Sequence, residues 1–146
     1  MATGESSRDG SVASVRRWAN ANRTVALILG VTLVSLLLRL VLLGERIAHF
    51  DEGRVAYWAM HYLDSGEFHY RYIIHGPLVQ HLDRWLFGLL GPTDFTMRLP
   101  VALIGGLLPA SILLFRRHLR RDELVAGAAF LALNPILVYY SRFFRS

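Results

Sequence analysis

Three long apolar runs constrain this chain more than any other feature. Residues 24–43 contain a single charge, Arg39, over twenty positions, which is the length that an α-helix needs to cross the core of a bilayer. Two uncharged runs follow, over 99–115 and over 124–140, and residues 96–98, which include Arg98, lead into the first of them. Soluble cores rarely hold three such runs in 146 residues, so the sequence predicts an all-α integral membrane protein with transmembrane helices at 24–43, 96–115 and 124–140.

Composition agrees with this class and excludes several others. Apolar residues make up 53% of the chain and charged residues 18%, against about 45–50% and about 25% in soluble domains. The absence of cysteine excludes disulfide scaffolds, thiolate zinc sites and cysteine nucleophiles. The net charge of +5 does not indicate a nucleic-acid partner, because the arginines lie between apolar runs and not on one polar surface. The expected partner is the lipid bilayer.

The distribution of arginine predicts the orientation. The tail 1–23, which we expect to be disordered and basic, carries four arginines, and so does the short loop 116–123. The segment 44–95 carries four arginines but seven acidic residues. The positive-inside rule places the tail and the short loop in the cytoplasm. Segment 44–95 and the end of the chain, 141–146, are then extracytoplasmic, in a multi-pass protein of the cell membrane.

The first apolar run has two other interpretations. A cleaved signal peptide has a shorter apolar core and small residues at its cleavage site, and residues 43–46 offer no such site. Arg16 and Arg17 before the apolar run also fit a twin-arginine export signal. A charge anchor on the cytoplasmic side accounts for the same two residues, and we prefer it.

The extracytoplasmic segment contains two helical patterns. One runs over about 51–63, with Gly66 as a stop signal. The other begins at Gly76–Pro77 and ends at Gly91–Pro92. Its apolar stripe is Leu78, Val79, Leu82, Trp85, Leu86, Leu89 and Leu90, and the polar residues Gln80, His81, Asp83 and Arg84 face away from it. A helix of this kind can lie in the membrane interface.

Asp51 and Glu52 are the sharpest chemical feature. They are adjacent carboxylates just beyond the outer end of the first predicted span. In a structural interpretation, Asp51 is the N-cap of the following helix and Glu52 interacts with the helix dipole. In a functional one, a carboxylate at the membrane surface acts as a general base or a metal ligand. Five histidines of this segment are a weaker metal candidate, since their spacing is irregular: His49, His61, His69, His75 and His81.

Arg39 lies four residues from the outer end of the first predicted span. A charge at the bilayer centre costs about 2.5–3.5 kcal/mol on insertion scales. We expect the Arg39 side chain to avoid that cost by extending to the outer interface. The alternative is that Arg39 faces a cavity for a lipid phosphate.

An ordered set of short motifs links these features over about 100 residues. It comprises His49-Phe50-Asp51-Glu52, Leu63-Asp64-Ser65-Gly66-Glu67-Phe68, Gly76-Pro77-Leu78, Trp85-Leu86-Phe87-Gly88, Arg98-Leu99-Pro100, Asn134-Pro135 and Tyr140-Ser141-Arg142-Phe143-Phe144-Arg145. In this set the chain resembles the GT-C type polytopic glycosyltransferases, which include dolichyl-phosphate-mannose protein mannosyltransferases and bacterial aminoarabinose transferases. It also resembles an archaeal branch of the family that is described as associated with flippase activity.

The resemblance implies transfer of a hexosyl or pentosyl group from a polyprenyl-(dolichyl-)phosphate donor to a protein, glycan or lipid acceptor outside the cytoplasm. It implies that Asp51 is the base towards the acceptor or the ligand of a divalent metal ion, with Glu52 as the second acid. It implies lipid-phosphate contacts for Arg142 and Arg145, which match the arginine-bearing exit of the third span. Arg54 and His75 are further candidates, and His75 stands near the place of a lysine in relatives.

Family members have many more spans and a further soluble portion. The resemblance therefore implies that this chain is the N-terminal part of a larger GT-C bundle and is inactive alone. Two other functions remain open. One is a non-catalytic membrane subunit or lipid-flipping helper with the same fold, and the other is a membrane anchor without activity. The acidic pair and the amphipathic helices favour an enzyme over an anchor, but they do not separate an enzyme from a helper.

Overall fold

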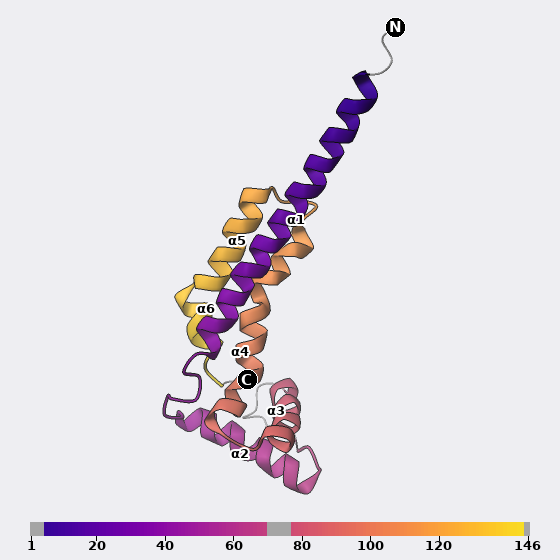
Figure 1. Ribbon diagram of the computed structural model, residues 1–146. Coiled ribbons are helices and arrows are strands. Elements are labelled where there is room, and N and C mark those ends of the chain that lie inside the picture. Colours follow the sequence, from indigo (N-terminus) through magenta and orange to yellow (C-terminus); the bar gives the residue numbers. More distant parts are fainter. Residues whose placement is uncertain (1–4, 70–76, 145–146) are drawn as a thin grey trace.

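The computed structural model describes residues 5–69 and 77–144, with side chains from residue 22 onward. Its elements are α1 (Glu5–Leu40), α2 (Phe50–Ser65), α3 (Pro77–Leu90), α4 (Asp94–Leu107), the 3₁₀ helix η1 (Leu108–Phe115), α5 (Arg121–Leu133) and α6 (Pro135–Tyr140). The described part of the chain is all-helical and contains no strand. Helices α1, α4, η1 and α5 lie side by side, and α2 and α3 form a separate layer at one end of them (Figure 1).

Two helical stretches are long and apolar enough to cross a membrane. They are Asn22–Leu40, within α1, and Asp94–Phe115, formed by α4 and η1. The first apolar stretch ends three residues before the predicted limit of 43, because the chain leaves the helix in a turn over 41–44 in which Leu42 has a φ of 55°. The second apolar stretch keeps its full length, although the helix changes from α to 3₁₀ geometry at Leu108. Pro109 lacks the N–H that an α-helical bond would need, and the chain continues in the tighter 3₁₀ form.

Helix α1 begins much earlier than its apolar stretch. Residues 5–23, for which the sequence predicted disorder, are helical in the structure. No proline interrupts them, and adding a residue to an existing helix is far easier than nucleating a new one. The polar composition that suggested disorder therefore did not exclude an extension of the apolar helix.

The third predicted span is two helices instead of one. Asn134 separates α5 from α6 with a ψ of 119°, outside the helical region. Its Oδ1 accepts hydrogen bonds from the N–H groups of Ile136 at 3.0 Å and Leu137 at 3.2 Å, so it caps α6. Pro135 is the cause, since proline disfavours a helical conformation in the residue before it. The thirteen residues of α5 extend only about 20 Å.

Helices α2 and α3 end where the sequence predicted. Gly66, with a φ of 73°, terminates α2, and its N–H donates to the carbonyl of Tyr62. Gly91, with a φ of 81°, follows α3. Both glycines adopt the left-handed conformation that other residues avoid.

The two faces of α3 are inverted relative to those of a soluble helix. Leu78, Trp85 and Leu89 are 61–76% exposed, whereas Gln80 and Asp83 are at most 1% exposed. The polar side packs inward because α3 contacts α2 and α4, and Phe87 on the inner side joins a core with Val55, Ala59, Met97 and Phe144. An outward apolar face is what an interfacial helix presents to lipid.

Candidate functional site

Glu52 is the centre of the junction between the α2–α3 layer and the long helices. Its side chain is completely buried. Arg98, from α4, binds it with two parallel hydrogen bonds, Nε to Oε1 and Nη2 to Oε2, both at 3.0 Å. Arg46 donates a third from Nη2 to Oε2 at 3.0 Å. The backbone N–H groups of His49 and Phe144 add bonds of 2.9 and 2.8 Å.

These donors fix the charge of Glu52. Burial by itself would raise the pKa of the Glu52 carboxyl, but the hydrogen bonds from Arg98 and from two backbone N–H groups outweigh it and lower the pKa to about 2. The carboxylate is thus ionised and saturated with donors, with no exposed surface. It is suited to holding the junction together and poorly suited to accepting a proton from a substrate.

Arg98 is as fully engaged as its partner. It is completely buried, and its Nη1 donates to the carbonyls of Leu43 at 3.0 Å and Arg46 at 2.9 Å. One guanidinium thereby joins α4, α2 and the turn that follows α1. The sequence marked residues 98–100 only as a motif, because nothing local indicates that an arginine entering an apolar helix pairs with an acid 46 residues earlier.

Asp51 lies beside Glu52 in a different environment. The structural interpretation predicted that Asp51 is the N-cap of α2, and this prediction is wrong. His49 holds that position, and the Asp51 N–H donates to its Nδ1 at 3.3 Å. The reason is the capping box that Glu52 closes by accepting the His49 N–H. The Asp51 carboxylate is therefore not needed as a cap, and its side chain keeps 31% of its surface exposed.

One guanidinium lies beside the Asp51 carboxylate. Arg54 Nη2 lies 3.4 Å from Oδ1, and His49 Nδ1, which accepts the Asp51 N–H, lies 3.8 Å from Oδ2. Within residues 5–69 and 77–144, no group of three or more His, Asp or Glu side chains is arranged to hold a metal ion. A neighbouring guanidinium also opposes a divalent cation, which prefers several oxygen ligands. The described residues thus do not fit the metal-ligand role implied for Asp51.

Arg142, a candidate for binding a lipid phosphate, caps the end of α1. Its Nη2 donates to the carbonyls of Val41 at 2.8 Å and Leu42 at 3.2 Å, and its Nη1 approaches that of Leu38 at 3.5 Å. Carbonyls at a helix C-terminus lack partners within the helix, and arginine is a common substitute. Of the other three candidates for this phosphate, Arg54 pairs with Asp51 and does not line the same groove as Arg142. His75 and Arg145 lie outside the described residues.

Arg46 and Arg142 line the same groove, which has a volume of about 610 Å³. The rest of its lining is mostly apolar: Leu38, Leu43, Leu133, Pro135, Val138 and Tyr139. The Arg46 guanidinium lies 5.0 Å from the centre of the Phe143 ring, and that ring is 5.8 Å from the ring of His49. The groove and Asp51 are therefore linked through His49. Arg46 was not predicted as a site residue, because only its charge beside an apolar run singles it out.

Arg39 neither reaches the interface nor faces this groove. It is completely buried. Its Nε donates to Ser141 Oγ at 2.8 Å and its Nη1 to Ser35 Oγ, while the carbonyls of Ala132 and Leu131 accept further bonds at 3.1 and 3.3 Å. Both expectations for Arg39 are wrong for the same reason. Oxygen atoms from α1, from the end of α5 and from the residue after α6 satisfy the guanidinium inside the helix bundle.

The site therefore consists of one partly exposed acid, Asp51, and a groove that contains two arginines and is connected to Asp51 through Phe143 and His49. Glu52 and Arg98 are the buried support of this site. Comparison of the chain with models of protein families, with curated proteins and with solved structures finds no match.

Proposed function

We propose that this chain is the N-terminal part of a membrane glycosyltransferase that uses a polyprenyl-phosphate-linked sugar as donor and acts outside the cytoplasm. The proposal includes membrane insertion with three spans, the third being the broken pair α5 and α6. The observation that carries it is the connection of Asp51, through His49 and Phe143, to the groove of Arg46 and Arg142, in a chain with two helices of membrane-spanning length.

In this proposal the groove holds the donor. Its apolar lining suits the first part of a polyprenyl chain, and guanidinium groups suit the phosphate, which they can bind with paired hydrogen bonds. Arg46 keeps 40% of its side chain exposed while one of its nitrogens binds Glu52. Because Arg142 already holds the carbonyls at the end of α1, it contributes mainly its charge to the phosphate.

Asp51 would act on the acceptor. Its carboxylate takes the proton of the acceptor hydroxyl as the acceptor oxygen attacks the anomeric carbon of the sugar. The bond between that carbon and the phosphate oxygen breaks, and the lipid phosphate leaves as an anion beside the arginines. Arg54 orients the carboxylate through the 3.4 Å contact.

The test compares Asp51→Asn with Asp64→Asn, an exposed aspartate on the same helix, in membranes that contain the complete gene product. The assay follows a radiolabelled sugar from its polyprenyl phosphate to the acceptor fraction. Asp51→Asn should lower the rate by about 100-fold or more, the scale of a lost general base. Asp64→Asn should leave the rate unchanged. Near-normal transfer by Asp51→Asn, at equal protein levels, would refute the role of base.

A non-catalytic membrane subunit or lipid-flipping helper is the second candidate. It is favoured by the engagement of Glu52 within the junction and by the lining of the groove, which includes no acid among the described residues. For a helper, Asp51→Asn has no effect, whereas loss of positive charge in the groove, as in Arg46→Gln, slows the movement of the lipid-linked sugar across the membrane.

A further inference from the structure

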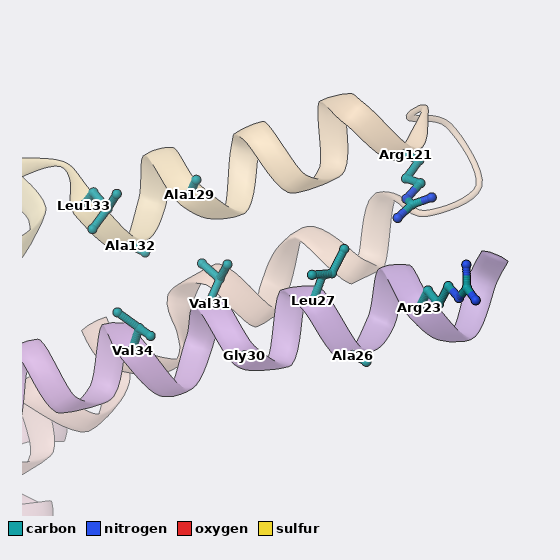
Figure 2. Close-up of a pocket in the computed structure, with 10 residues that line it drawn as sticks. All are labelled: Arg23, Ala26, Leu27, Gly30, Val31, Val34, Arg121, Ala129, Ala132 and Leu133. Atoms are coloured by element: carbon teal, nitrogen blue, oxygen red, sulfur yellow. The ribbon is translucent and has the colours of Figure 1, made fainter. Parts of the chain in front are cut away.

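A second groove lies between α1 and α5, and Leu133 lines both this groove and that of Arg46 and Arg142. It has a volume of about 670 Å³. Its lining is Arg23, Ala26, Leu27, Gly30, Val31 and Val34 from α1, with Arg121, Ala129, Ala132 and Leu133 from α5 (Figure 2). Apart from the two arginines, every one of these residues is apolar. Gly30 contributes no side chain to the groove, and a side chain added there would meet nothing within 4 Å.

The length of the groove matches one leaflet of a bilayer. From Arg23 to Val34 the lining covers eleven steps along α1, or about 16 Å at a rise of 1.5 Å per step. Half of a hydrocarbon core is about 15 Å thick. The groove thus extends from one membrane surface to about the middle of the bilayer, which is the depth of a single phospholipid acyl chain.

The charges of the groove are all at one end. Arg23 and Arg121 lie together at that end, and the opposite end is formed by Val34, Ala132 and Leu133 (Figure 2). The two acids at the start of α5 interact with Arg120, which does not line the groove. Asp122 lies 3.5 Å from the Arg120 side chain, and Glu123 accepts the Arg120 N–H at 2.7 Å. An anion at the end of the groove would therefore meet two guanidinium groups.

We propose that this groove binds one anionic phospholipid, with an acyl chain between α1 and α5 and the phosphate between Arg23 and Arg121. The proposal depends on membrane insertion but not on catalysis. The orientation expected from the arginines makes this a lipid of the cytoplasmic leaflet. Neutral lipids would fill the same groove with lower affinity, since their headgroups carry no net charge to attract the arginines.

The experiment uses the chain purified in a non-ionic detergent and titrated with phosphatidylglycerol or with phosphatidylcholine of the same acyl chains. Native mass spectrometry counts the lipids bound to each chain. Arg121→Gln and Ala129→Leu test the two halves of the groove. Their matched controls are Arg120→Gln and Ala126→Leu, at exposed positions of the same segment that do not line the groove. Thermal unfolding of each variant verifies that the chain is folded.

We expect one phosphatidylglycerol molecule to bind in preference to phosphatidylcholine. Arg121→Gln should weaken this binding about five-fold, the usual effect of one basic residue at an anionic lipid surface. Ala129→Leu should weaken it to a similar or larger extent by filling the groove, and the two controls should bind as the parent chain does.

Three results would overturn the proposal. Equal binding of the two lipids would remove the role of the arginines. Equal effects of Arg120→Gln and Arg121→Gln would show a diffuse attraction to a basic surface and not a site. Full lipid binding by Ala129→Leu would show that the lipid does not enter the groove. If this variant also lost self-association, the groove would be the binding site of another helix.

Discussion

Asp51 and Glu52 are neighbours in sequence with opposite environments. Glu52 receives its hydrogen bonds from Arg98, Arg46 and two backbone N–H groups, so its charge belongs to the interior of the molecule. Asp51 points to the partly exposed side, where Arg54 is its nearest cation. A single step along α2 therefore separates a carboxylate that stabilises the fold from one that is available for chemistry.

The buried environment of Glu52 predicts that neutralising it destabilises the fold, whereas neutralising an exposed acid does not. Glu52→Gln should lower the free energy of unfolding by about 3–5 kcal/mol, because it leaves the buried Arg98 without a counter-charge. Glu45→Gln, an exposed acid nearby, should change it by less than about 0.5 kcal/mol. Denaturation of the purified chain in detergent, followed by tryptophan fluorescence, provides both values. Equal stability of the two variants would contradict the role of Glu52 in the junction.

Asp83 is a second buried acid, and no ion pair to it is formed among the described residues. It is completely buried on the inner side of α3, and neither of its oxygens has a hydrogen-bond partner within the described part of the chain. Burial raises the pKa of the Asp83 carboxyl from 3.8 to about 8. At neutral pH this residue is therefore mostly protonated, and the folded chain binds a proton that the unfolded chain releases.

The stability of the chain should accordingly fall as the pH rises. The contribution of Asp83 is complete below about pH 4, where both states are protonated, and it is lost as the pH approaches 8, at up to about 1.4 kcal/mol per pH unit. Asp83→Asn, which is neutral at every pH, should abolish this slope, whereas Asp64→Asn should keep it. Melting temperatures between pH 5 and 8.5 test this. Parallel curves for the parent chain and Asp83→Asn would rule out a buried, protonated Asp83.

At the scale of elements, the sequence predicted the features that act locally. Gly66 and Gly91 end helices through their own backbone chemistry, so their positions could be read from the sequence directly. Pro135 also acts locally, but the run 124–140 was predicted as one span and its interruption was not predicted. Which side of α3 packs inward could not be read, since a periodic stripe indicates that a helix has two faces but not which neighbour each one meets. The acid that pairs with Arg98 could not be predicted either, because that contact depends on the packing of α2 against α4.

The packing of α4 depends on two adjacent glycines. A side chain at Gly106 would overlap Leu36 of α1, and one at Gly105 would overlap Ser141. Ser141 in turn accepts the hydrogen bond from Arg39. Gly105 therefore lets α4 approach the atoms that satisfy the buried guanidinium, and this contact links α1, α4 and the end of α6.

Replacement of Gly105 by alanine should disrupt this contact. We expect Gly105→Ala to cost about 1–3 kcal/mol by overpacking, although alanine is the better helix former. The matched control is Gly53→Ala on α2, where an added methyl group meets nothing within 4 Å. That variant should gain up to about 1 kcal/mol from helix propensity alone. Denaturation in detergent gives both free energies of unfolding. A gain in stability for Gly105→Ala would show that α4 is packed less closely against Ser141 than the structure indicates.

The whole molecule has two distinct ends. The loop between η1 and α5 lies at the same end of the bundle as Arg23, since Arg23 and Arg121 line one groove (Figure 2). The α2–α3 layer lies at the opposite end (Figure 1). The basic tail and the basic loop are thus at one end of the molecule, and the acidic segment is at the other. The orientation expected from the distribution of arginine can therefore be tested with few substitutions.

Because the chain has no cysteine, single cysteines can report the side on which each segment lies. We expect a membrane-impermeant maleimide to label Ser65→Cys in intact cells, since Ser65 is exposed at the end of α2. Gly10→Cys and His118→Cys should react only after the cells are permeabilised, because the tail and the basic loop face the cytoplasm in this orientation. Leu33→Cys, in the middle of the apolar stretch of α1, serves as a control that should react in neither condition. Labelling of Gly10→Cys but not Ser65→Cys in intact cells would invert the orientation and move Asp51 to the cytoplasmic side, where a donor presented at the outer surface could not reach it.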